Sequence, residues 1–166
     1  MSTPSRTVVG MTRSGPQLAL LLLGSYRKLV DSAVDELARR GYHDVRPVHD
    51  FAMRAIAAGA DNASELGRRL SVSKQAAAKT IATLVERGYV VRAQDPSDRR
   101  RTRIEVTPLG VQVMQTGEAI FDELRQAWAL QLGSAELETL EAQLKNFVGG
   151  APIRSEAPGW VALQLD

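Results

Sequence analysis

The feature that most constrains this chain is a pair of apolar helical stripes that lie only a few residues apart. Two short segments of alternating apolar and polar residues follow at once. Asp61 or Asn62 can cap the first stripe, because short polar side chains accept hydrogen bonds from the free N–H groups of a first helical turn. Ser73 begins the second stripe and Gly88 ends it. The apolar positions are Leu66 and Leu70 in the first stripe and Ala77, Ile81, Leu84 and Val85 in the second. These spacings predict two helices that pack against one core.

The two alternating segments cover residues 89–94 (YVVRAQ) and 102–107 (TRIEVT). Their β-branched residues predict a hairpin whose long, basic tip is the loop DPSDRRR. A short helix, a tight turn, a second helix and a hairpin make a winged helix-turn-helix. The expected fold class is therefore mainly α with a small β-wing, in which further helices flank a winged helix-turn-helix core.

The segments before this core are a short arm and a long helix. Residues 1–15 are small and polar, and they predict a flexible N-terminal arm. A helical stripe then runs to Gly41, which ends the pattern as a C-cap does, so residues 16–46 form the first helical region. The stripe consists of Leu22, Tyr26, Leu29, Val30, Ala33 and Leu37.

The remaining boundaries follow from proline, glycine and capping residues. Pro47 opens a helix that closes at Gly59, so the winged domain is expected to cover residues 47–107. One face of this helix should hold Val48, Ala52, Ala55 and Ile56. Thr107-Pro108 begins a long helix and Ser134 is expected to cap the last one, within residues 108–148. We predict no function for the tail, residues 149–166.

Charge is distributed unevenly along the chain. The net charge is only +2, but residues 64–103 carry ten Lys/Arg against four Asp/Glu, a net of +6. The rest of the chain carries eleven against fifteen, a net of −4. A basic region on an otherwise acidic protein predicts a polyanionic partner, and nucleic acid is the first candidate.

Composition disfavours several other functions. The chain has no cysteine, which excludes disulfides, thiolate metal sites and catalytic thiols. The apolar run from Leu18 to Leu23 is much shorter than the roughly 18 to 20 residues that span a bilayer. With no secretion signal in view either, we expect a cytoplasmic protein that does not associate with membranes.

Enzyme-like patterns are weak. Ser71 to Lys74 matches S-x-x-K, but the partner motifs of that enzyme class are missing. His43 and His49 flank a proline turn without the spacing of metal ligands, so a capping or surface role is favoured. We therefore expect no catalysis, metal or cofactor.

The segment from residue 63 to residue 110 closely resembles the DNA-binding region of the MarR family of winged helix-turn-helix regulators. A weaker resemblance in helix order and length extends over residues 16–148. The most specific piece is DPSDRR followed by a strand ending in VTPLG, which is similar to that family's aspartate-x-arginine wing and strand-to-helix junction. The resemblance implies a dimeric transcriptional regulator, most simply a repressor, that binds double-stranded DNA.

Residues 73–87 are the expected reading helix. Gln can pair with adenine through two hydrogen bonds, Lys can reach guanine or phosphate, and an alanine methyl can touch a thymine methyl. The expected DNA contacts here are Ser73, Lys74, Gln75, Ala78 and Lys79. Family members often carry Ser or Thr where this chain has Ala76 and Ala78, so fewer hydroxyl donors are present.

The wing tip should supply the anchor. A hairpin tip can place an arginine in the minor groove, where narrow A·T-rich DNA concentrates negative potential. The resemblance implies that Arg100 is the inserted residue and that Asp98 holds the tip by an ion pair. Arg99 and Arg101 are expected to meet phosphates, and Arg103 points outward and could do likewise.

The flanking helices carry more apolar surface than a small DNA-binding core needs, which predicts a partner surface. The resemblance implies a homodimer formed by the N- and C-terminal helices, 16–46 and 108–148. It also implies a small aromatic or phenolic effector bound between these helices and the winged domain. Tyr26, His49, Arg54 and Trp128 are the candidate pocket residues, although packing or surface roles are favoured for each.

Two other binding functions fit the same fold class. A winged helix can bind protein instead of DNA, because fold alone does not decide function. The combination of Lys74, Gln75 and Lys79 with a basic wing tip favours DNA over that alternative. RNA binding is disfavoured because only 5% of the chain is aromatic, mostly in apolar stripes.

Overall fold

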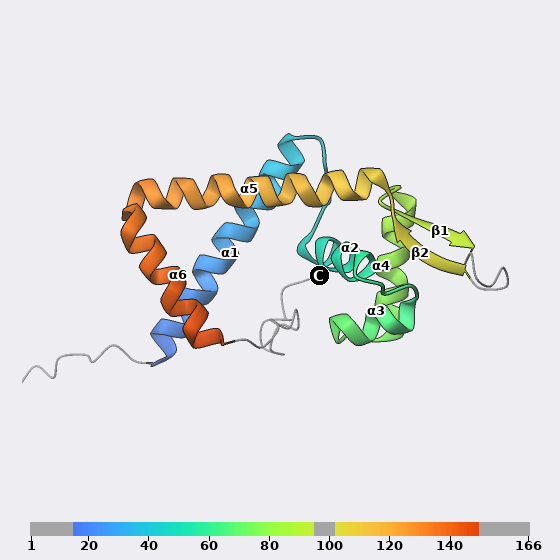
Figure 1. The fold of residues 1–166 in the computed structure, drawn as a ribbon, viewed down its shortest axis with the longest axis horizontal. Helices are drawn as coiled ribbons and strands as arrows, with labels where there is room; N and C mark the ends of the chain where they lie inside the picture. Colours follow the sequence, from blue (N-terminus) through green and yellow to red (C-terminus); the bar gives the residue numbers. More distant parts are fainter. Residues whose placement is uncertain (1–14, 95–101, 150–166) are drawn as a thin grey trace, which may run out of the picture.

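A computed structural model describes residues 15–94 and 102–149, and its elements follow the predicted order (Figure 1). The helices are α1 (Gly15–Arg39), α2 (Pro47–Ala57), α3 (Ala63–Leu70), α4 (Lys74–Glu86), α5 (Pro108–Leu132) and α6 (Ser134–Val148), and the strands are β1 (Val90–Gln94) and β2 (Thr102–Val106). The predicted fold class is confirmed. The predicted N-terminal arm and most of the tail lie outside the described residues, so what the sequence predicts for them stays a prediction.

The long helix α5 organises the molecule. In Figure 1, α2, α3, α4 and the wing lie toward the N-terminal end of α5, whereas α6 descends from its C-terminal end. Helix α1 packs along α5, and α2 and β2 also contact it. The winged domain and the terminal helices are thus two regions joined by one continuous helix.

Three helices end in the same way. At Gly41, Gly59 and Gly88 the backbone takes a positive φ of 93°, 99° and 73°, which glycine adopts without a steric penalty. After each glycine the next N–H closes the helix by donating to a carbonyl five residues back: Tyr42 to Leu37, Ala60 to Ala55, and Tyr89 to Leu84, all at 2.9 Å. These contacts confirm the predicted glycine stops.

The core lies among the C-terminal part of α1, helices α2, α3, α4 and α5, and the base of the wing. Its largest fully buried side chains are Met53, Leu66, Leu84, Ile120, Val90 and Val113. On α2 the prediction was wrong in one position, because Val48 is 41% exposed. The buried stripe is His49, Ala52, Met53 and Ile56, the i, i+3, i+4, i+7 pattern, so Val48 falls at its edge.

The wing is joined tightly to α5. Strands β1 and β2 pair antiparallel, with Val90 opposite Val106 and Gln94 opposite Thr102. At their base the Thr107 hydroxyl donates to the Gly88 carbonyl at 2.6 Å and accepts from the Gly110 N–H at 3.1 Å. A Cβ on Gly110 would stand 2.3 Å from the Tyr89 carbonyl oxygen, so only glycine lets α5 begin here. This contact explains the VTPLG sequence physically.

The prediction that Ser134 caps α6 was wrong. Gly133 occupies the N-cap position, at φ 98°, and Ser134 is already the first helical residue. The reason is steric. The sharp reversal between α5 and α6 requires a positive φ at the N-cap position, and this backbone conformation favours glycine over serine. The cap therefore lies one residue earlier than the side-chain preference indicates.

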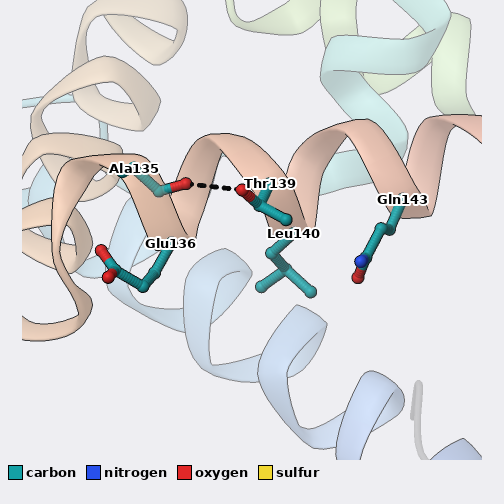
Figure 2. A pocket seen from close by; sticks show the side chains of 5 residues that line it. All are labelled: Ala135, Glu136, Thr139, Leu140 and Gln143. Atoms are coloured by element: carbon teal, nitrogen blue, oxygen red, sulfur yellow. Dashed lines mark hydrogen bonds between the residues drawn. The ribbon is translucent and has the colours of Figure 1, made fainter.

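The outer helices expose apolar side chains. Among these are Leu18, Leu20, Leu21, Leu22 and Tyr26 on α1, Phe121, Leu130 and Leu132 on α5, and Leu140, Leu144, Phe147 and Val148 on α6. A shallow hollow of about 300 Å³ lies on α6, and Figure 2 shows Leu140 there pointing from α6 toward α1. We name the exposed apolar residues of α1 and α6 the outer apolar surface.

Candidate nucleic-acid interface

Helices α3 and α4 form the predicted helix-turn-helix. Asn62 caps α3, because its Oδ1 accepts from the N–H groups of Ser64 and Glu65, both at 3.0 Å. Ser71 ends α3 in the left-handed region, with φ 55°, and Ser73 caps α4 by accepting from the Ala76 N–H at 3.1 Å. The turn is therefore set by two serines and a short loop.

Gly67 fixes how close the two helices come. A Cβ at this position would stand 2.9 Å from the carbonyl oxygen of Val72 in the turn. A side chain would therefore push the turn away from α3 and tilt α4. Sequence reasoning gave this glycine no role, since a glycine inside a helical pattern carries no signal for a close approach 5 residues later.

The N-terminal half of α4 divides into a buried and an exposed face. Ala77, Ile81 and Leu84 are buried in the core. The opposite face is exposed and contains all the expected contacts on this helix, namely Ser73, Lys74, Gln75, Ala78 and Lys79, as well as Ala76. Small and polar side chains thus surround two lysines on a surface that a partner can reach.

The wing presents further basic groups beside this face. Arg92 on β1 is exposed, and Arg103 on β2 has a side chain that is 40% exposed and forms an ion pair with Glu105. The expected tip residues Asp98, Arg99, Arg100 and Arg101 lie outside the described residues. Their roles remain predictions.

A polar hollow of about 380 Å³ opens where α3, α4 and the wing meet. It is lined by Lys74, Arg103, Ser64, Thr102, Asp61, Asn62 and Ala63. The Ile104 N–H donates to the Asp61 carbonyl at 3.0 Å, which ties β2 to the start of α3. The hollow therefore lies between a residue of the exposed α4 face and the start of β2, at the end of the strand pair away from Thr107.

His49, proposed from sequence as a pocket residue, is a buried capping group. Its Nδ1 accepts from the Arg46 N–H at 3.1 Å, at the start of α2. Burial lowers the pKa of His49, and the nearby charges of Arg87 and Arg46 lower it further. The imidazole is therefore held in its neutral form, which fits the capping alternative raised for the histidines.

The other three pocket candidates lie on separate helices. Tyr26 on α1 is 52% exposed, and Trp128 on α5 is partly buried. Arg54 on α2 is engaged by two carboxylates, with Asp50 at 2.7 Å and Glu118 of α5 at 2.7 Å. Hydrogen bonding to Asp50 raises the pKa of Arg54. Neither of the two hollows described above is lined by any of the four candidates.

Sequence reasoning missed three arginines that hold the interface in place. Arg69 donates to the Ala58 carbonyl at 2.7 Å and to Glu65 at 2.9 Å, and Arg87 donates to the Asp44 carbonyl at 2.6 Å. Arg40 bridges α1 to α5 through Glu123 at 2.6 Å. Only the Glu65–Arg69 pair, at i and i+4, has a signal in the sequence. The other contacts join residues far apart in the chain.

Within residues 15–94 and 102–149, no helix is long and apolar enough to cross a membrane. In the same part of the chain, no group of three or more His, Asp or Glu side chains could hold a metal ion.

Comparison with known proteins first matches the segment that contains the helix-turn-helix and β1. Residues 43–101 match the sequence profile described as MarR family. A protein of Thauera aromatica, proposed to regulate transcription of the hcr operon, is 34% identical over 82 residues, and this match covers 49% of each chain. The chain thus spans about half the length of that curated relative.

Solved structures extend the likeness to the flanking helices. The multiple antibiotic resistance repressor MarR is 25% identical, with a TM-score of 0.61 over 80% of this chain and 95% of that one. The reduced form of MarR from E. coli has a TM-score of 0.65 at 24% identity, covering 80% and 96%. A mutant of S. aureus MepR bound to an oligodeoxyribonucleotide has a TM-score of 0.58 at 19% identity, covering 79% and 95%.

Proposed function

The chain belongs to the MarR family of winged helix-turn-helix transcriptional regulators, and from this premise we propose that it binds a specific double-stranded operator as a homodimer and represses transcription. The observation that carries the proposal is the exposed N-terminal face of α4, where Lys74, Gln75 and Lys79 stand clear of the core. An exposed helix of this composition suits the major groove. DNA binding by the MepR relative supports the same assignment.

The proposed role of each interface residue follows from the chemistry of its side chain. Gln75 reads adenine, and Lys79 reaches guanine or phosphate. The alanine methyls of this face, Ala78 among them, contact thymine methyls, and Ser73 places backbone N–H groups beside a phosphate. Arg100 enters the minor groove with Asp98 supporting the tip, while Arg99 and Arg101 meet phosphates.

A second copy of the chain would cover the outer apolar surface. Leu18, Leu20 and Leu21 on α1 are each about 60% or more exposed, which is costly for so many large apolar side chains in water. Burying them with the exposed residues of α6 is expected to give an interface on the order of 2,000 Å² or more. Two α4 helices would then read half-sites about one helical turn apart on a pseudo-palindrome.

We also propose that a small aromatic or phenolic anion releases the DNA. Tyr26, Arg54 and Trp128 are the residues that could contact it, and Arg54 would have to leave Glu118 or Asp50 to pair with the anion. His49 would then act indirectly, by holding the start of α2. The protein is expected to act in the cytoplasm, where its DNA lies.

The decisive experiment is selection of duplexes from a random-sequence library by the purified full chain, followed by fluorescence anisotropy across a salt series. We expect a preference of about 10³-fold or more over shuffled duplexes, with a steep salt dependence. Gln75→Ala should lose discrimination at one base pair, worth about 1 to 3 kcal/mol. Negligible, salt-insensitive binding to all duplexes would overturn the proposal and favour a protein-binding winged helix.

A further inference from the structure

The hollow between α3, α4 and the wing is basic. Lys74 and Arg103 line it with two positive charges, and Asp61 adds one negative charge. The Asp61 carboxylate already accepts a hydrogen bond from the Asn62 side chain at 2.6 Å. The lining residues therefore carry a net charge of +1, and Glu105, which pairs with Arg103, lies outside this lining. A phosphodiester group would pair with the two cations.

We propose that this hollow holds one backbone phosphate of the bound duplex, clamped between Lys74 and Arg103. This inference rests on the proposed function and deepens it. The hydroxyls of Ser64 and Thr102, which also line the hollow, are neutral donors to the same phosphate. Lys74 is then a phosphate contact and not a reader of guanine.

Arg103 is oriented for this role by its neighbours. Its Nε is buried and makes no hydrogen bond to any described residue, although it lies against the Glu105 carboxylate. The ion pair with Glu105 engages the Nε edge of the guanidinium, while the side chain as a whole remains 40% exposed. A planar guanidinium held at one edge presents its remaining N–H groups in a fork that matches phosphate oxygens.

The frame of the hollow is already assembled. The Ile104–Asp61 backbone hydrogen bond fixes β2 against the start of α3, and Ser73 fixes the first turn of α4. Asn62 occupies the N–H groups of Ser64 and Glu65, so these two groups are not available to the phosphate. A preformed site of this kind binds with little further ordering of the backbone.

The place of the hollow fits a helix lying in the major groove. Phosphates line both edges of that groove, and contacts to them set the register of the helix. Lys74 borders both the hollow and the exposed α4 face that carries Gln75. One clamped phosphate at this border would fix the position from which Gln75 reads its base.

A methylphosphonate scan tests the clamp directly. The duplex selected by the full chain is synthesised with one uncharged methylphosphonate at a time along each strand, and its affinity is measured for the native protein, Lys74→Ala and Arg103→Ala. We expect one position that weakens the native protein and to which both variants have become insensitive. The clamp would be overturned if either variant stayed sensitive to methylphosphonate at that position, or if the two variants lost sensitivity at different positions.

Salt dependence gives a second readout. Each variant should reduce by about one the slope of log affinity against log salt concentration. Its loss of affinity relative to the native protein should therefore shrink about 3- to 4-fold when salt is raised fourfold. Lys28→Ala and Arg27→Ala remove the same charges from exposed polar positions on α1. Where light scattering shows an unchanged mass, these controls should leave both affinity and the methylphosphonate pattern unchanged. An equal effect of these controls would show a general charge effect and contradict the clamp.

Three further arms separate the remaining explanations. Arg103→Lys keeps the positive charge and should restore the methylphosphonate sensitivity that Arg103→Ala loses. Failure to restore it in a folded variant counts against the clamp. Inorganic phosphate at matched ionic strength should compete no better than chloride, and strong competition would assign the hollow to a free anion. If the native protein binds no duplex, the proposed function fails as well, whereas native binding without a shared position overturns the clamp alone.

Discussion

Arg87 donates from its guanidinium to the carbonyl oxygen of Asp44 at 2.6 Å, which joins the C-terminal end of α4 to the turn before α2. The same Nη1 lies 3.4 Å from His49 Nδ1. One side chain therefore links the C-terminal end of α4 to the α1–α2 connection.

Removing this side chain should destabilise the fold. Arg87→Ala leaves the Asp44 carbonyl without its charged donor, and we expect a loss of roughly 1.5 to 3 kcal/mol in the free energy of unfolding, measured with urea. Asp44→Gly is the matched control, because it keeps the backbone carbonyl and relieves a non-glycine residue at φ 64°. If the two variants unfold at the same urea concentration, the hydrogen bond contributes little.

Stability should decrease as pH falls below the ordinary pKa of histidine. Burial lowers the pKa of His49 from its usual 6.5, so the unfolded chain binds a proton more readily than the folded one in the range below 6.5. The stabilisation is complete above that pH and is lost toward the folded-state pKa. Urea unfolding between about pH 7.5 and 5.5 should show this loss, and His49→Gln should reduce it. An unchanged pH dependence in His49→Gln would assign the effect to other groups.

Two glycines of α5 should respond in opposite ways to alanine. At Gly110 the new Cβ would meet the Tyr89 carbonyl at 2.3 Å and Val106 Cγ1 at 2.7 Å, so Gly110→Ala should cost about 1 to 3 kcal/mol or more. At Gly117 nothing lies within 4 Å, so Gly117→Ala should be neutral or stabilise the helix by up to about 1 kcal/mol. Thermal unfolding of both variants checks this contrast, and equal melting temperatures would contradict it.

Capping should matter at Asn62 and not at Ser134. Asn62→Ala removes two hydrogen bonds at the start of α3 and should cost about 1 kcal/mol. Ser134→Ala should change stability by less than about 0.5 kcal/mol, because Gly133 is the N-cap and Ser134 makes no capping bond. A larger loss from Ser134→Ala in chemical denaturation would place the cap at the serine after all.

The proposed dimer can be tested on α1. Leu21 is 61% exposed, and Leu21→Glu would place a charge inside an interface built on the outer apolar surface. Light scattering should then show a shift from dimer to monomer. Val91→Glu, at a 45% exposed position on β1, should leave the mass unchanged. A native protein that is monomeric at micromolar concentration would rule out the dimer.

The helix ends were predictable from sequence because local chemistry determines them. Gly41 and Gly88 close helices through a positive φ, and Asn62 and Ser73 cap through their own side chains. Ser134 failed as a predicted cap because a reversal between two helices imposed a backbone requirement stronger than the side-chain preference.

Contacts across the fold were not predictable in this way. Arg87 reaches a carbonyl 43 residues away, and nothing near either residue marks the pair. His49 was correctly considered for a capping role, yet its burial depends on where α4 packs against α2. The polar hollow combines residues near 61, 74 and 103, which meet only after the wing folds back on α3.

The junction at Thr107 and Gly110 makes the wing an extension of α5. A helix of 25 residues is about 37 Å long at 1.5 Å per residue. A tilt of about 5° at the end of α5 next to α6 would therefore move the base of the wing by about 3 Å, the length of one hydrogen bond. Helix α5 acts as a lever arm, through which a change of packing among the outer helices displaces the arginines of the wing relative to the DNA.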